Sequence, residues 1–343
     1  MSKQILVTGG TGYIGSHTCV ELINEGYDVV IADNLSNSDV SVLDGIEKIT
    51  GKRPHFEKID LSDAIETSYL FDKYPEIIAV IHFAAFKAVG ESVNIPLKYY
   101  YNNLNSLIHI LNNMEKRKIA NIVFSSSCTV YGEPDSLPVT ERAPIKPASS
   151  PYGNTKQICE EILKDTELIN SNLQVISLRY FNPVGAHPSA LIGELPIGIP
   201  NNLVPFITQT AIGIREELKV FGDDYNTPDG SAIRDYINVV DLSKAHVTAI
   251  GRLLNHKNKK KFEVFNLGTG RGYSVLEVIR AFEKACNIKL KYQIVPRREG
   301  DVEKVFADTR LANAELGWQA EKGLEETLLS AWNWEKAYQN KKQ

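Results

Sequence analysis

Two residues four positions apart, Tyr152 and Lys156, have the types and the spacing that suit proton transfer. Residues at this spacing lie on one face of a helix, so the two side chains would be neighbours. Ser127, which follows the apolar run Asn121–Ser126, adds a hydroxyl that could orient a substrate hydroxyl or relay its proton. A tyrosine and a lysine at this spacing are also common on helix surfaces, so the pair needs support from a binding site nearby.

A glycine-rich segment near the start of the chain supplies that support. Gly9, Gly12 and Gly15 follow an apolar run of strand length and precede a helical pattern. In nucleotide-binding units the first glycine permits a tight turn, the second lets the backbone approach a pyrophosphate, and the third lets helix and strand pack closely. The diphosphate then lies at the helix N-terminus, where unpaired N–H groups favour anions. The pattern predicts a dinucleotide site, and a glycine-rich turn without a ligand is the alternative.

The end of the second apolar run, at Asp33, indicates which dinucleotide. An acidic residue there accepts hydrogen bonds from the adenosine ribose hydroxyls and repels a 2′-phosphate. The following residues, from Asn34 to Asn37, contain no arginine that could receive such a phosphate. We therefore predict NAD rather than NADP, with a turn or helix cap as the alternative role for Asp33. Asp60 and Leu61, which close a further strand, could reach the adenine edge.

A bound nicotinamide ring would also make Tyr152 a workable base. Its pKa must fall by about 3 units to reach neutral pH, which is ~4 kcal/mol. One positive charge about 6 Å away supplies about 3 kcal/mol at an effective dielectric constant of 20. Lys156 and an oxidised nicotinamide together would therefore suffice.

The elements that must position these residues follow from the alternation of short apolar runs with helical patterns. We expect strands at Gln4–Thr8, Asp28–Asp33, Ala79–Phe83, Asn121–Ser126 and Gln174–Tyr180, and helices at Thr11–Asn24, Leu97–Glu115 and within 149–170. Such alternation is typical of βαβ units with a parallel sheet. The predicted fold class is α/β, a Rossmann-type doubly wound parallel sheet followed by a smaller C-terminal α/β substrate domain.

The chain changes character after Tyr180. The stretch Phe181–Pro205 is rich in Pro, Gly and Asn, which is too irregular for further βαβ units. We predict a dinucleotide-binding domain over residues 1–180 and a substrate-binding domain over 181–343, with parts of 235–268 returning to the first.

Composition excludes several classes of protein. The 343 residues include 38 Lys plus Arg and 42 Asp plus Glu, a net charge of −4 that gives no footprint for nucleic acid. Hydrophobic residues make up 43%, which excludes a disordered chain. No apolar run approaches the ~20 residues that cross a bilayer, so we expect no membrane association. The four cysteines lack metal-ligand spacing, and the strand pattern begins almost at once, so we expect a cytoplasmic protein without a metal.

Several longer motifs resemble a known family. Gly9–Gly15, Ser125–Ser127 before Val130-Tyr131-Gly132, and Tyr152 with Lys156 resemble the extended short-chain dehydrogenase/reductase family. Further segments resemble the UDP-glucose (UDP-galactose) 4-epimerases of that family: 82–92, 179–186, 199–203, 234–237 and 297–301. The resemblance runs from about residue 4 to 318 without an evident gap.

The resemblance implies a mechanism. Tyr152 removes the proton of the sugar 4-hydroxyl while NAD takes the hydride from C4, with Ser127 assisting and Lys156 holding the nicotinamide ribose. The 4-keto sugar then rotates and receives the hydride on its opposite face. UDP-galactose and UDP-glucose would thus be interconverted with NAD bound throughout.

The resemblance also implies the binding residues. For NAD they are Gly9, Gly12, Tyr13, Ile14, Gly15, Asp33, Asn34, Asp60, Leu61, Phe83, Ala84, Ala85, Lys87, Asn102, Tyr152, Lys156 and Tyr180. For the UDP-sugar they are Ser127, Tyr152, Asn182, Asn202, Leu203, Phe221, Arg234, Arg298, Asp301 and Val305. Two arginines suit a diphosphate because guanidinium groups pair bidentately with phosphate oxygens.

Three alternatives remain. Sugar-nucleotide 4,6-dehydratases of similar sequence carry an Asp-Glu pair before Val-Tyr-Gly, and related decarboxylases keep a glutamate at the second position. This chain has Cys128 and Thr129 there, and neither is a suitable acid. A non-catalytic NAD sensor would be expected to lose Tyr152 or Lys156, and both are present.

Two further expectations concern specificity and assembly. Val305 stands where the resemblance places a large tyrosine in epimerases restricted to UDP-glucose and UDP-galactose. A smaller side chain leaves room for an N-acetyl group at C2, so we expect UDP-N-acetylglucosamine and UDP-N-acetylgalactosamine to be accepted also. The alternative is that Val305 simply packs, with its neighbours closing the gap, because pocket room alone does not ensure acceptance. Family members are commonly homodimers, and the helices at Leu97–Glu115 and 152–170 are the candidate interface. Their apolar stripe, Leu104, Leu107, Ile108 and Leu111, could equally pack on the sheet.

Overall fold

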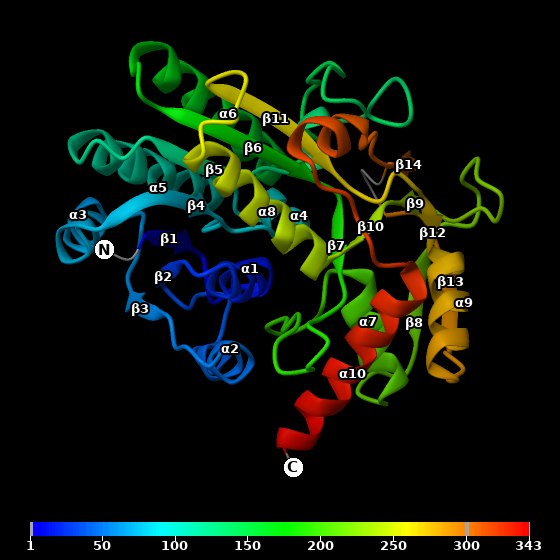
Figure 1. Ribbon diagram of the computed structural model, residues 1–343. Coiled ribbons are helices and arrows are strands. Elements are labelled where there is room, and N and C mark those ends of the chain that lie inside the picture. Colours follow the sequence, from blue (N-terminus) through cyan, green and yellow to red (C-terminus); the bar gives the residue numbers. More distant parts are fainter. Residues whose placement is uncertain (1–2, 299–301, 343) are drawn as a thin grey trace.

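A seven-stranded parallel sheet forms the centre of the molecule in the computed structural model, which describes residues 3–298 and 302–342 (Figure 1). The strand order is β11-β6-β5-β4-β1-β2-β3. Their bounds are β1 Gln4–Thr8, β2 Asp28–Asp33, β3 His55–Lys58, β4 Ile77–His82, β5 Asn121–Ser125, β6 Gln174–Tyr180 and β11 Phe262–Leu267. The order reverses between β1 and β4, which is where doubly wound sheets bind ligands at their carboxyl ends. The predicted Rossmann-type α/β fold class is confirmed.

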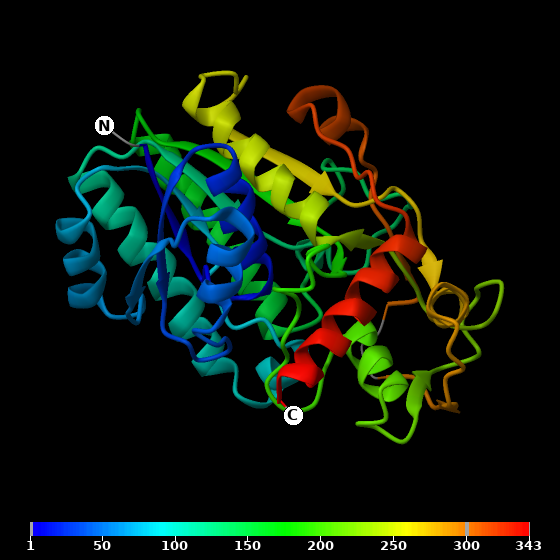
Figure 2. The same cartoon turned by 60° about the horizontal axis from the view of Figure 1, so that its bottom comes forward.

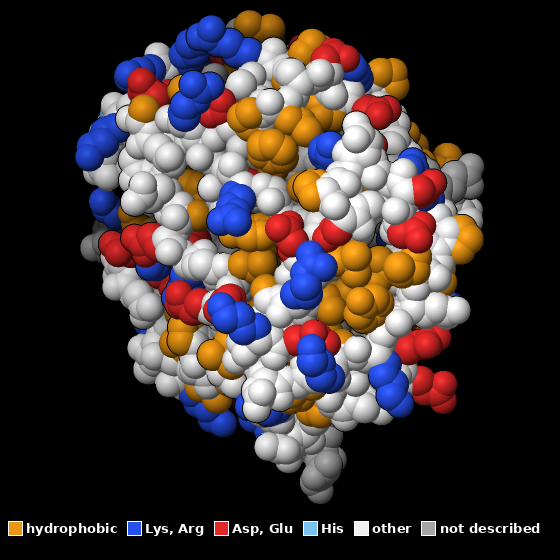
Figure 3. Space-filling view, turned by 90° about the vertical axis from the view of Figure 1, so that its right-hand side faces the viewer, with side chains coloured by type: hydrophobic (Ala, Val, Ile, Leu, Met, Phe, Trp, Pro, Cys, Tyr) orange, Lys and Arg blue, Asp and Glu red, His pale blue; other side chains and the backbone are white. Residues whose placement is uncertain are grey.

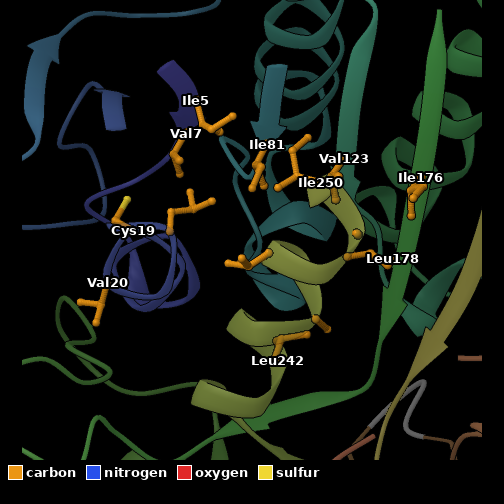
Figure 4. Close-up of a cluster of buried hydrophobic side chains, with 14 of the residues drawn as sticks. Ile5, Val7, Cys19, Val20, Ile81, Val123, Ile176, Leu178, Leu242 and Ile250 are labelled. Carbon is orange, nitrogen blue, oxygen red and sulfur yellow. The ribbon is translucent and has the colours of Figure 1, made fainter. Parts of the chain in front are cut away.

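Helices cover both faces of this sheet. One face carries α1 Tyr13–Asn24, α2 Val42–Thr50 and α8 Val239–Leu254, and the other carries α3 Ala64–Lys73, α5 Pro96–Lys116 and α6 Pro151–Ile169. The short helix α4 Val89–Asn94 precedes α5. Residues such as Ile5, Val7 and Ile81 point from the sheet toward α1 and α8 and are fully buried (Figure 4). A strand buried on both faces needs an apolar residue at nearly every position, which explains the unbroken apolar runs.

The rest of the chain adds small sheets and three helices beside the carboxyl ends of the large sheet (Figure 1). The strands pair as β7 Asn182–Val184 with β10 Tyr236–Asn238, β8 Leu218–Phe221 with β13 Tyr292–Val295, and β9 Ile233–Arg234 with both β12 Tyr273–Ser274 and β14 Lys304–Val305. The helices α7 Leu203–Ala211, α9 Val275–Cys286 and α10 Leu324–Lys342 share one apolar cluster (Figure 2). Two short turns complete the description, a 3-10 helix η1 Cys128–Tyr131 and a π-helix η2 Ala312–Leu316.

The surface on the α9 side carries separate hydrophobic patches interrupted by charged side chains (Figure 3). Among residues 3–298 and 302–342, no helix combines the length and apolar character needed to cross a bilayer. On α5, Leu107 and Leu111 belong to the core beneath the sheet and Leu104 packs against it, so three of the four residues of the predicted interface stripe pack internally. Ile108 remains 37% exposed.

Candidate active site

The glycine turn between β1 and α1 is pressed against the end of β4. Gly9 has φ +69°, and a Cβ there would lie 2.8 Å from the backbone N of Ala84. A Cβ on Gly15 would lie 2.3 Å from the Gly9 carbonyl oxygen, so both positions require glycine. Gly12 caps α1 without a side chain, and the first turn of the helix contains no acid. The N–H groups of that turn have no acceptor within the helix, which suits them to a phosphate.

Asp33 organises the loop that faces this turn. Its carboxylate accepts hydrogen bonds from the Thr11 N–H (3.2 Å), the Leu35 N–H (2.9 Å) and the Ser38 hydroxyl (3.2 Å). The carboxylate is thus held at the carboxyl end of β2, beside the glycine turn, where the sequence placed a ribose acceptor. Asn34 accepts from the Ser36 N–H at 3.0 Å in the same loop.

Asp60 and Leu61 follow β3, the strand next to β2. Asp60 accepts hydrogen bonds from the Ser62 N–H (2.9 Å) and hydroxyl (2.7 Å). The Leu61 carbonyl lies 3.1 Å from Nδ1 of His109 on α5. These contacts fix the loop at the far edge of the predicted dinucleotide site.

The segment after β4, which contains Phe83, Ala84 and Ala85, is held by two polar residues that sequence reasoning missed. The Thr8 hydroxyl contacts Nδ1 of His82 at 2.9 Å and accepts from the Ala84 N–H at 3.3 Å. The buried amide of Asn103 accepts from the Phe86 N–H (2.8 Å), donates to the Phe86 carbonyl (3.1 Å) and donates to the Thr155 hydroxyl (3.0 Å). Asn103 thereby joins this segment to α5 and α6. The predicted cofactor residue Asn102 donates to Asn103 at 3.0 Å.

Tyr152, Lys156, Ser127 and Tyr180 converge at the carboxyl ends of β5 and β6. Ser150 caps α6 by accepting from the Gly153 N–H at 3.2 Å, which starts the helix just before Tyr152. The Lys156 ammonium donates to the Ser125 carbonyl at 2.7 Å and lies 4.8 Å from the centre of the Phe124 ring. The Tyr180 hydroxyl contacts the Ser125 hydroxyl at 2.6 Å. Ser127 caps η1: its hydroxyl oxygen accepts a hydrogen bond from the Thr129 N–H at 3.2 Å.

Burial dominates the electrostatics of this cluster. It raises the pKa of Tyr152, the nearby Tyr180 adds to the rise, and the Ser127 hydroxyl opposes it. Burial also lowers the pKa of Lys156 to about 8. The protein's own groups therefore leave Tyr152 protonated at neutral pH, whatever Lys156 contributes. The sequence-based expectation that Lys156 acts together with a nicotinamide ring remains a prediction.

A buried ion pair behind the cluster was also missed. Glu160 accepts hydrogen bonds from the hydroxyls of Ser126 (2.7 Å) and Ser177 (2.8 Å) and from Nε of Arg179 (2.9 Å). Both ionic side chains are almost completely buried. Because a buried charge is costly without partners, this network fixes α6 against β5 and β6 and so fixes the position of Tyr152.

The predicted substrate residues lie on the small sheets and on the start of α7. Val305 on β14 pairs in register with Arg234 on β9. The Arg298 guanidinium stacks on the ring of Phe221, 4.5 Å from its centre. Asn182 begins β7, and Asn202 and Leu203 stand at the start of α7. Asp301 lies outside the described residues.

Val305 packs among Val130, Phe181 and Ala307, and the partly buried Cys128 borders the same cluster. Burial raises the pKa of the Cys128 thiol to about 12, so it stays neutral and acts as an apolar neighbour. Asp235, next to Arg234, is fully buried and accepts from the N–H groups of Thr269 (2.8 Å) and Ala307 (3.2 Å). Nothing in the sequence pattern indicated this anchoring role.

Comparisons with known proteins agree with this arrangement. A family model described as GDP-mannose 4,6 dehydratase matches residues 6–330. The UDP-glucose 4-epimerase of Bacillus subtilis is 52% identical over 336 residues, 98% of each chain. A UDP-glucose-4-epimerase structure from Stenotrophomonas maltophila, with bound NAD and formylated UDP-arabinopyranose, superposes with a TM-score of 0.95 at 47% identity and covers 99% of both chains. A UDP-glucose 4-epimerase from Bifidobacterium longum, in complex with NAD+ and UDP, has a TM-score of 0.94 at 47% identity and covers 98% of this chain and 99% of its own.

The family model covers a broader group of proteins than the epimerases to which this chain is similar in the comparisons above. At the position where the dehydratase pattern needs an acid, this chain has Thr129, whose buried hydroxyl finds no hydrogen-bond partner among residues 3–298 and 302–342. The relatives at about half identity over almost the full length are named as epimerases. The chain belongs to the extended short-chain dehydrogenase/reductases that this model describes, and within them to the UDP-glucose 4-epimerases, which are NAD-dependent isomerases.

Proposed function

We propose that this chain interconverts UDP-galactose and UDP-glucose by inverting C4 of the hexose, with NAD retained at the glycine turn. The observation that carries the proposal is the buried group formed by Tyr152, Ser127 and Lys156 at the carboxyl ends of β5 and β6. The proposed site also includes the glycine turn, which suits a dinucleotide, and Arg234 on β9. No acid stands at Thr129 to support an elimination.

The residues present fit NAD. Gly9 and Gly15 leave no room for a side chain, the first turn of α1 has no side-chain cap, and Asp33 faces that turn. Lys156 is buried with one hydrogen bond described for its three donors, so it has donors left for a ribose. Bound there, NAD supplies a reversible hydride acceptor for the carbon that is inverted.

The chain's own residues handle the proton. Tyr152 takes the proton of the sugar 4-hydroxyl as the C4–H bond of the sugar breaks. It returns the proton to the 4-oxygen when the C4–H bond re-forms. Ser127 lies beside the phenol and orients the same hydroxyl. Lys156 stays charged below pH 8 and favours the phenolate, because an opposite charge stabilises it.

The diphosphate end must stay fixed while the hexose turns. In this proposal Arg234 and Arg298 pair with the diphosphate, and stacking of the Arg298 guanidinium on the Phe221 ring supports its orientation. Asn182, Asn202 and the backbone at Leu203 add polar contacts at the uridine end. Fixing only the nucleotide leaves both faces of C4 able to meet one hydride acceptor.

We further propose that Val305 admits an N-acetyl group at C2. Valine leaves more space than tyrosine beside Arg234, with which it is in register. The proposed substrates are then also UDP-N-acetylgalactosamine and UDP-N-acetylglucosamine.

The proposed organisation has an NAD-binding part over residues 1–180, joined by parts of 235–268, and a UDP-sugar-binding part over the remainder. We also propose a homodimer and a cytoplasmic location. The exposed residues Val93, Leu97 and Tyr101 on α4 and α5 are the proposed contact.

The test is incubation of the purified protein with UDP-galactose, and separately with UDP-N-acetylgalactosamine, without added cofactor. Chromatography of the products should show conversion of both. Conversion of UDP-galactose alone would remove only the wider specificity. Loss of water from the sugar would identify a dehydratase, and binding of NAD without conversion of either sugar would identify a sensor.

A further inference from the structure

One carboxylate, that of Glu194, faces both proposed ligand sites. Its Oε1 accepts a hydrogen bond from Nδ2 of Asn202 at 2.6 Å and lies 3.6 Å from Nζ of Lys87. The Glu194 side chain is only 11% exposed. A carboxylate so far removed from water needs partners, and these are the two that the described residues provide.

The backbone of Glu194 is fixed independently of its side chain. Its carbonyl accepts from Nε1 of Trp334 on α10 at 3.0 Å. The preceding Gly193 lies under the same indole, where a Cβ would come within 2.4 Å of the ring. The C-terminal helix therefore holds the backbone of Glu194 in place, and the carboxylate contacts the side chains of Asn202 and Lys87.

The two partners of Glu194 belong to different ligands. Lys87 lies 6.0 Å from the centre of the Tyr13 ring, next to the glycine turn. Asn202 is the N-cap residue of α7, yet its side chain makes no capping bond and turns to Glu194 instead. Glu194 thus determines the direction of Asn202 at the cost of a helix cap.

We propose that Glu194 is a positioning residue that holds Asn202 for the UDP-sugar and Lys87 for the dinucleotide, so that one side chain serves both binding sites. The proposal rests on the proposed function for the identity of the two ligands. The two contacts differ in kind: Asn202 needs a hydrogen-bond acceptor, whereas Lys87 needs a negative charge.

This difference gives a test with two variants. Glu194→Ala removes acceptor and charge, whereas Glu194→Gln removes the charge and keeps a carbonyl acceptor. We expect Glu194→Ala to raise the KM for UDP-galactose and the Kd of UDP about five- to tenfold, since an oriented hydrogen bond is lost. Its kcat should stay within about twofold, because Glu194 does not touch the reacting carbon. Glu194→Gln should show the parental KM and Kd. Both variants should release NAD faster than the parent, and by the same factor.

Two controls separate this role from a general loss of structure. Glu321→Ala removes an exposed carboxylate that pairs with Lys244 at 3.5 Å, and it should change none of these quantities. In a double-mutant cycle, Asn202→Ala should cost less UDP affinity in the Glu194→Ala background than in the parent. Parental KM and NAD release in Glu194→Ala, a Gln variant as impaired in KM as the Ala variant, or additive effects in the cycle would overturn the proposal. Failure of the parent to convert UDP-galactose would instead overturn the proposed function. The role of Glu194 would still be tested by calorimetric measurement of UDP binding and by the NAD content of the variants.

Discussion

At the scale of single residues, burial opposes ionisation of the proposed base, Tyr152. Burial raises the pKa of Tyr152, and the same burial lowers the pKa of Lys156 to about 8. Desolvation therefore works against both charged forms that proton abstraction needs. A cationic ligand ring beside the phenol would reverse this balance only when the site is assembled. The proposed base would then act on a bound sugar and stay inert otherwise.

Replacement of the phenol tests this assignment. Tyr152→Phe keeps the ring and removes the group that accepts the proton, so kcat for UDP-galactose should fall by about 10²- to 10⁴-fold, as for other general bases. The NAD content of the purified protein should remain unchanged. Tyr69→Phe, at a position that is 55% exposed on α3, is the matched control and should keep parental activity. A Tyr152→Phe variant with kcat near the parental value would exclude the phenol as the base.

The side chain at position 305 should set the range of sugars. Val305 is 9% exposed and in register with Arg234, so Val305→Tyr would fill buried space, which the proposed function places beside the sugar. We expect activity on UDP-N-acetylgalactosamine to fall at least about tenfold relative to UDP-galactose, the scale of steric discrimination in a pocket. Val40→Tyr, at an exposed position, should leave the ratio of the two activities unchanged. An unchanged ratio in Val305→Tyr would end the hypothesis.

At the scale of elements, the local sequence pattern predicted several strand bounds, because those bounds depend on local burial. The ranges expected for β1, β2 and β6 agree with the structure, because doubly covered strands leave unbroken apolar runs. Contacts between distant segments produce no comparable pattern in the sequence. Asn103 with Phe86, Glu160 with Ser177, and Trp334 with Glu194 each depend on where whole elements dock. Sequence identified the groups suited to chemistry and missed those that hold them in place.

Asn103 illustrates the energetic weight of such a contact. Its amide makes three hydrogen bonds that join α5, α6 and the segment after β4. Asn103→Ala leaves buried polar groups without their hydrogen bonds, so we expect the free energy of unfolding to fall by about 2–4 kcal/mol. Asn112→Ala, at an exposed position on the same helix, should change it by less than about 0.5 kcal/mol. Urea denaturation measures both, and an equally small effect at Asn103 would show that the network is dispensable.

At the scale of the whole molecule, α4 and α5 leave apolar side chains outside the core. Leu97 is 80% exposed, and Tyr101 and Ile108 lie on the same face of α5. If this face joins two copies, Leu97→Glu places a charge in the contact and should shift the mass measured by light scattering from dimer to monomer. Ile214→Glu, at a 52% exposed position remote from α5, should leave the mass unchanged. A Leu97→Glu variant that remains dimeric would place the contact elsewhere.

Three buried histidines should make the whole fold sensitive to mild acid. Burial lowers the pKa of His17 and His82 to about 3 and that of His246 to about 4. The unfolded chain binds protons at these residues below about pH 6.5 while the folded chain does not, so stability is lost as the pH falls from 6.5 toward 4. Each histidine contributes ~1.4 kcal/mol per pH unit in this window.

The free energy of unfolding from urea titrations should therefore fall by about 4 kcal/mol between pH 7 and 5.5. His246→Leu should remove about a third of that slope, because leucine cannot bind a proton in the unfolded chain. His256→Asn, at an exposed position, should leave it intact. Burial is the main cause of the lowered pKa of His82, and the positive charge of Lys156 lowers it further. A flat stability profile between pH 7 and 5.5 would mean that these histidines accept protons without unfolding, and that the sheet ends around the site open more readily than their burial indicates.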